Sequence, residues 1–81
     1  MKKLYIFKLP SHFETIFNKA RLKAEENKVS FLGDMDSGKF SGKGFEGDYH
    51  VVNGLITFTI TKKPFIVPWS LIENSLKKYF V

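Results

Sequence analysis

The sequence predicts an α+β domain in which a curved antiparallel β-meander packs on a C-terminal helix, in the order β-α-β-β-β-β-α. Two observations predict the sheet: the dipeptide Asn53-Gly54 separates two apolar runs, and apolar and polar residues alternate on both sides of it. A third predicts the helices, because apolar residues recur at helical spacing before and after the sheet region. We expect residues 1–81 to form a single domain.

The Asn53-Gly54 dipeptide sets the register of the sheet. Both residues tolerate the positive φ angles that a two-residue type I′ turn requires. The inward face then pairs Val51 with Ile56, Tyr49 with Phe58 and Gly47 with Ile60. The other face pairs Glu46 with Thr61, Asp48 with Thr59 and His50 with Thr57. One face is therefore apolar and the other polar.

Two earlier turns predict the same inward face. A tight turn at Lys43-Gly44 pairs Phe40 with Gly47, and a four-residue turn over 34–37 pairs Phe31 with Phe40. Agreement between turns is informative because a slip of one residue would invert a strand. The inward face also receives four glycines, where a missing side chain permits bending or close approach by another element. These are Gly33, Gly38, Gly42 and Gly47.

The N-terminal segment predicts a strand and then a helix. The strand covers Lys2 to Leu9, ends at Pro10 and pairs with the strand from Leu55 to Thr61. Ser11 and Glu14 have the spacing of a capping box, so we expect a helix from there to about Asn27, packed at an edge or end of the sheet. Its apolar stripe comprises Phe13, Ile16, Phe17, Ala20 and Ala24.

After the sheet, residues 62–68 are predicted to be extended, because each proline restricts the residue before it. A helix follows, with Pro68 at its first position or with Ser70 and Glu73 as a second capping box. Its apolar stripe comprises Trp69, Ile72, Leu76, Tyr79 and Phe80. A curved sheet that closes on this helix would be an abbreviated helix-grip arrangement.

Composition limits the compartment and the partners. A domain of 81 residues buries only about 60% of its unfolded surface, so its core must be used efficiently. The chain has no Cys, and its apolar N-terminal run is too short for a signal peptide or a membrane span, so we expect a cytoplasmic protein. The net charge is +5, but the lysines are dispersed and Arg21 is the single arginine, which disfavours nucleic acid as a partner.

Two glycine-containing patterns in the segment 42–47 resemble nucleotide or RNA motifs. The letters match GxGxxG, but a dinucleotide site needs a helix after the glycines, and here a strand is predicted. Lys43-Gly44-Phe45 resembles the start of an RNA-recognition signature, from which Glu46, Asp48 and His50 depart. We therefore predict no bound cofactor.

The same three residues form the most catalytic-looking group in the sequence. Glu46, Asp48 and His50 alternate on one strand face, which would place two carboxylates and an imidazole together. Exposed alternating charge is also what a sheet with one wet face requires. The segment 34–38 resembles the start of a calcium loop but lacks the third acid and the distal Glu. We predict no catalytic residue and no metal site.

A set of positions between Gly47 and Leu76 resembles a family of small bacterial proteins, the polyhydroxyalkanoic acid system (granule-region) proteins. The resemblance implies a leading strand and helix, a meander and a final helix after a proline, and association with storage-polymer granules or their metabolism. It contains no chemical motif, so it implies no functional residue. The positions are Gly47, Val51, Ile56, Pro68, Ile72, Glu73 and Leu76.

Fold analogy and the aromatic content favour a non-enzymatic binding module. Its binding partner would be an apolar ligand, a polymer-granule surface, a protein or a second copy of the chain. The alternative is binding of nucleic acid or an anionic surface through Lys2, Lys3, Lys62, Lys63, Lys77 and Lys78, if the chain ends converge. We expect the C-terminal helix to close over the glycines and leave a filled core rather than a cavity. The predicted apolar-binding face comprises Phe31, Phe40, Tyr49, Phe58, Ile60, Trp69 and Ile72.

Overall fold

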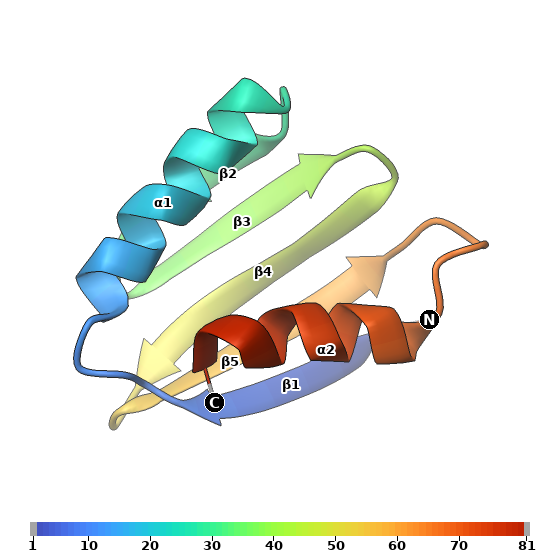
Figure 1. Ribbon diagram of the computed structural model, residues 1–81. Coiled ribbons are helices and arrows are strands. Elements are labelled where there is room, and N and C mark those ends of the chain that lie inside the picture. The colour runs from blue at the N-terminus through green and yellow to red at the C-terminus, as the bar shows by residue number, and fades with distance from the viewer. Residues whose placement is uncertain (1, 81) are drawn as a thin grey trace.

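The computed structural model describes residues 2–80 of the chain. The elements are β1 (Lys3–Lys8), α1 (Phe13–Glu26), β2 (Ser30–Gly33), β3 (Ser37–Gly42), β4 (Phe45–Val52), β5 (Leu55–Lys62) and α2 (Trp69–Phe80). The strands form one antiparallel sheet in the spatial order β1-β5-β4-β3-β2, and both helices lie on the same face of it (Figure 1). The predicted α+β class and element order are confirmed. No helix within residues 2–80 is long and apolar enough to cross a membrane.

The predicted turns and nearly all of the predicted register are confirmed. Asn53 and Gly54 have φ angles of 53° and 76°, and Lys43 and Gly44 have 53° and 87°, as type I′ turns require. All the predicted inward pairs of β2 to β5 occur. The exception is on the outer face, where an irregularity in β4 pairs Glu46 with Lys62 rather than with Thr61. The bulge shifts the register by one residue at the end of the strand.

Both predicted capping boxes are wrong. The α1 helix begins at Phe13, and His12, which makes no side-chain capping bond, occupies the N-cap position. The amide of Phe13 donates to the carbonyl of Pro10 at 3.2 Å, so Ser11 belongs to a turn before the helix. The α2 helix begins at Trp69, which places Ser70 inside the helix and leaves Pro68 directly before it.

Aromatic rings, and not the C-terminal helix, fill the space that the central glycines leave. A Cβ atom on Gly38 would lie 2.6 Å from the ring of Tyr49, and one on Gly47 would lie 2.7 Å from the ring of Phe40. Each ring lies across the glycine that its own residue faces on the neighbouring strand. The expectation that α2 would pack on these glycines is therefore wrong, because the rings already occupy that position.

The two helices lie over opposite edges of the sheet. The α1 helix packs against β2 and α2 packs against β1, while the sheet between them stays uncovered (Figure 1). The helices meet at one end only, where the rings of Phe13 and Phe80 lie 6.3 Å apart, and they diverge from there. The predicted edge position of α1 is confirmed. The predicted filled core is wrong, because a groove remains between the helices.

Candidate ligand-binding groove

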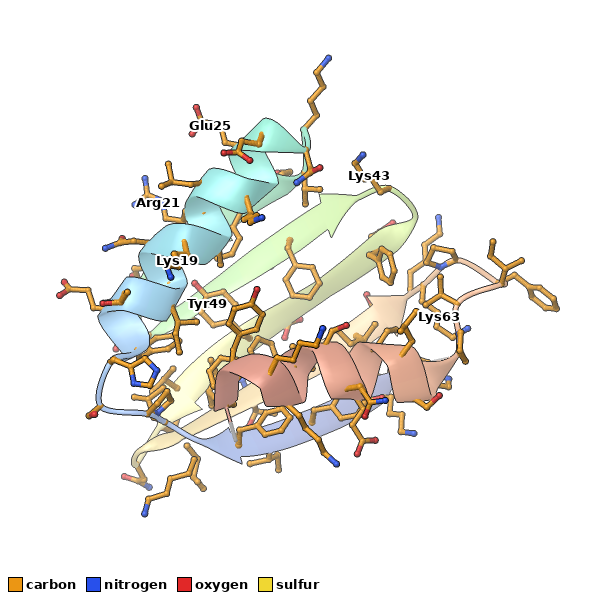
Figure 2. All side chains as sticks on the ribbon, viewed as in Figure 1. Lys19, Arg21, Glu25, Lys43, Tyr49 and Lys63 are labelled. Atoms are coloured by element: carbon orange, nitrogen blue, oxygen red, sulfur yellow. The ribbon has the colours of Figure 1, made fainter. Side chains whose placement is uncertain are left out.

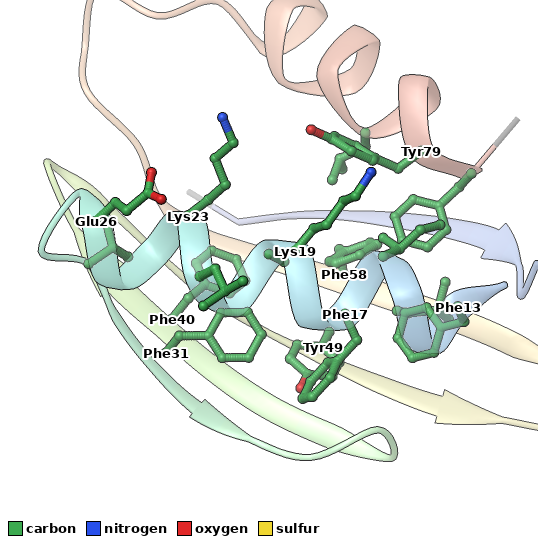
Figure 3. Close-up of a pocket in the computed structure, with 17 residues that line it drawn as sticks. Phe13, Phe17, Lys19, Lys23, Glu26, Phe31, Phe40, Tyr49, Phe58 and Tyr79 are labelled. Carbon is green, nitrogen blue, oxygen red and sulfur yellow. The ribbon is translucent and has the colours of Figure 1, made fainter.

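A groove of about 700 Å³ lies over the centre of the sheet between the two helices. Its floor is the sheet, one wall is α1 and the other is the C-terminal half of α2 (Figure 3). We call it the interhelical groove. It is lined by Phe13, Ile16, Phe17, Lys19, Ala20, Leu22, Lys23 and Glu26 of α1, by Val29, by Phe31, Phe40, Tyr49, Ile56 and Phe58 of the sheet, and by Leu76, Tyr79 and Phe80 of α2.

Six aromatic rings that line the interhelical groove form a closed circuit. Neighbouring ring centroids are 5.3 to 6.3 Å apart, which is the range in which aromatic rings attract one another. The rings come from both helices and three strands, so the circuit connects α1, the sheet and α2. In order around the circuit they are Phe13, Phe17, Phe31, Tyr49, Phe58 and Phe80.

The structure brings together only part of the predicted apolar-binding face. Four of its sheet residues line the groove, namely Phe31, Phe40, Tyr49 and Phe58. Ile60 is buried but is not part of the lining. Trp69 and Ile72 also lie outside it, because they belong to the N-terminal half of α2, where that helix has diverged from α1.

Several residues that line the groove belong to α1 and to the end of α2, and the predicted apolar-binding face did not include them. Phe13 and Phe17 are buried, and Phe80 stacks on Phe7 with a centroid distance of 5.5 Å. Their signal was present in the sequence, since all three belong to the predicted apolar stripes of the helices. An amphipathic stripe indicates that a face is covered but does not say which residues across the sheet it meets.

Tyr49 is the polar group in the floor of the groove. Its hydroxyl donates a hydrogen bond to the carbonyl oxygen of Asp34 in the turn between β2 and β3. Burial raises the pKa of Tyr49, and the nearby carboxylate of Asp34 raises it further. The phenol therefore stays neutral and already has a partner, so the floor offers a ligand mainly apolar contact.

The charged side chains of the groove lie at its rim on α1. Lys19 and Lys23 are four residues apart and therefore share one side of the helix, with Glu26 one turn further on. Figure 3 shows Lys19 and Lys23 extending from α1 toward the side where Tyr79 of α2 lies. Lys19, Lys23 and Glu26 are exposed, and so is Tyr79. The groove thus combines an apolar floor with a rim that carries two cations and one anion.

The group of Glu46, Asp48 and His50 lies on the other face of the sheet. Glu46 forms an ion pair with Lys62, with 3.8 Å between Oε2 and Nζ. Asp48 faces Lys39 on β3 and Thr59 on β5, and His50 faces Thr57. These residues are separated from the interhelical groove by the sheet itself.

The lysines near the chain ends converge only in part. The ammonium groups of Lys3 and Lys63 lie 5.7 and 5.3 Å from the ring centroid of Trp69, so these two share one aromatic neighbour. Lys77 forms an ion pair of 3.1 Å with Glu73 on α2.

No protein-family model, curated protein or solved structure matches the chain.

Proposed function

We propose that this protein binds an elongated apolar ligand in the interhelical groove. The observation that supports the proposal is the groove itself: about 700 Å³ of space lined mainly by aromatic and aliphatic side chains. Small-molecule sites have volumes of about 300–1,000 Å³ and similar linings. A small domain that leaves such a surface open forgoes stabilising burial, which a bound ligand would restore.

The rim favours a ligand with an anionic end. Lys19 and Lys23 stand above an apolar floor, and a long-chain carboxylate could place its chain on the rings and its head group beside the two ammonium groups. Such a contact is worth little while it is exposed, so the chain would supply most of the affinity and the lysines would orient it. We therefore propose a long-chain carboxylate as the ligand class.

The proposed role is that of a binding protein in the cytoplasm and not that of an enzyme. The floor of the groove presents Tyr49 as a neutral phenol that already donates to Asp34. The resemblance to granule-associated proteins suggests a polymer surface as an alternative occupant, and a protein segment is another. Both would use the same aromatic floor, so the test has to separate them from a small ligand.

A filled-groove variant tests the proposal. Ala20 lines the groove, so Ala20→Trp would place a bulky ring in it without removing any buried side chain. Asn18 is exposed on the opposite side of α1, and Asn18→Trp is the matched control. Binding of a fluorescent long-chain carboxylate would be titrated by its own emission, since Trp69 lies outside the groove.

We expect saturable binding by the wild type, a loss of about tenfold or more in affinity for Ala20→Trp, and a change within about twofold for Asn18→Trp. The double variant Lys19→Gln with Lys23→Gln should bind the carboxylate more weakly than the wild type does, and should bind the corresponding alcohol with unchanged affinity. Absence of saturable binding, or equal loss in both tryptophan variants, would refute a small-ligand site. Binding of the alcohol and the carboxylate with equal affinity would refute the role of the two lysines.

A further inference from the structure

The connection between β5 and α2 carries the two most exposed large apolar side chains described in the molecule. Phe65 is 98% exposed and Ile66 is 88% exposed. The amide of Val67 donates to the carbonyl of Pro64 at 3.1 Å, which closes a turn with Phe65 and Ile66 at its tip. We propose that this segment, which we call the 63–68 loop, docks the protein on the surface of an anionic lipid bilayer.

Lysines surround the base of the 63–68 loop. Lys62 and Lys63 precede the tip, and the ammonium groups of Lys3 and Lys63 lie 5.7 and 5.3 Å from the ring centroid of Trp69, at the base of the loop. Lys43 is also near, since a Cβ atom placed on its neighbour Gly44 would lie 3.0 Å from the ring of Pro64. Figure 2 shows Lys43 and Lys63 at the same end of the molecule. Glu46 offsets part of the charge through its pair with Lys62, which is exposed and therefore weak.

The combination of an apolar tip and a cationic base matches the two layers of a bilayer surface. Phe65 and Ile66 would enter the boundary of the acyl chains while the lysines stay at the level of the anionic head groups. Trp69, half-buried at the base of the loop, would lie at the interface that tryptophan favours. A nucleic acid would use the lysines but would leave Ile66 in water, so the exposed pair favours lipid.

The loop is held in shape before it meets a partner. Pro64 and Pro68 restrict the backbone on both sides of the tip, and the carbonyl of Trp69 accepts a 3.4 Å hydrogen bond from Tyr5 of β1. Such a loop loses little conformational entropy on binding. The site lies outside the interhelical groove, so this inference does not depend on the proposed ligand.

The experiment is cosedimentation of the full chain with vesicles. One set contains phosphatidylcholine alone and the other contains phosphatidylcholine mixed with phosphatidylglycerol. The test variant is Phe65→Ser with Ile66→Ser, and its control is Leu32→Ser, which removes a 71% exposed leucine from β2. A second pair compares Lys43→Gln plus Lys62→Gln with Lys8→Gln plus Lys78→Gln, which remove the same charge elsewhere.

We expect binding to the anionic vesicles only, a loss of about tenfold or more in the double serine variant, and no change in Leu32→Ser. Each lysine removed at the loop should weaken binding by about fivefold, and the distant lysines should matter less. Failure to bind anionic vesicles, or retained binding by the double serine variant, would overturn the inference. So would binding of nucleic acid that requires the loop lysines in the absence of vesicle binding.

Discussion

Tyr49 contributes both ring packing and a hydrogen bond to the floor of the groove. Its ring lies across Gly38 and belongs to the aromatic circuit, while its hydroxyl donates to the carbonyl of Asp34. The side chain of Asp34 accepts hydrogen bonds from the amides of Asp36 and Ser37 at 2.8 and 3.0 Å, and these bonds lower the pKa of Asp34, the one from Ser37 most. Tyr49 therefore connects the groove floor to a turn that is itself ordered.

We predict that Tyr49→Phe lowers the free energy of unfolding by about 1 kcal/mol at neutral pH, because the carbonyl of Asp34 loses its donor. The difference from wild type should shrink above about pH 10, where tyrosine ionises in the unfolded chain. The sign follows from the raised pKa of Tyr49: the unfolded state releases its proton first, so wild-type stability falls as pH rises. Urea unfolding across this pH range, with exposed Tyr79→Phe as the control, measures both effects. A difference in unfolding free energy that does not change with pH would contradict the raised pKa of Tyr49.

At the scale of elements, turns with positive φ angles fix the register of the sheet. Gly54 has a φ of +76°, and a Cβ atom placed there would have no other heavy atom within 4 Å. Any cost of a substitution at Gly54 therefore comes from the backbone and not from a clash. Lys43 and Gly44 also have positive φ angles, but a Cβ atom placed on Gly44 would lie 3.0 Å from Pro64, so a substitution there would combine backbone strain with a close contact.

We predict that Gly54→Val destabilises the fold by about 1 kcal/mol or more, since a β-branched residue is strained at positive φ. Gly54→Asn is the matched control and should cost less, because asparagine tolerates this conformation. Thermal and urea unfolding of both variants measures the difference. Equal stability of the valine variant and the wild type would remove this turn as the determinant of register.

At the scale of the whole molecule, the least secured element is α2. None of its described residues is fully buried, and it makes ring contacts at one end and accepts a hydrogen bond at the other. Phe80 contacts the rings of Phe7, Phe13 and Phe58 at one end, and Trp69 accepts the bond from Tyr5 at the other. The groove lies beside the C-terminal half of α2, where Leu76, Tyr79 and Phe80 line it.

We predict that the amides of α2 exchange hydrogen faster than those of β4 and β5 in the free protein, because local opening of a weakly packed helix needs less free energy than global unfolding. A saturating long-chain carboxylate should slow exchange in α2 by about tenfold or more. Hydrogen-exchange mass spectrometry with Ala20→Trp as the control tests both parts. Faster exchange in β4 than in α2 would contradict the first part, and protection that persists in Ala20→Trp would contradict the second.

The sequence by itself determined the strands, and it determined the order and nearly all of the register of β2 to β5, because the turns that join these strands depend on local chemistry. Asn53-Gly54 and Lys43-Gly44 accept positive φ angles wherever they occur, and alternation then assigns Tyr49 and Phe58 to one face. The same reasoning identified four sheet residues of the groove, Phe31, Phe40, Tyr49 and Phe58, but missed Ile56.

Only the tertiary structure decided where the helices lie, and hence whether the inward face is filled or open. A stripe such as that of α2 indicates a covered face but not its position over the sheet, so Phe80 joined the groove while Trp69 did not. A glycine such as Gly38 leaves room that a helix or a ring could take, and the ring of Tyr49 took it. The position of α2 and the packing over Gly38 both depend on which of several segments, distant in the sequence, occupies the same space. A local sequence pattern contains no information about that.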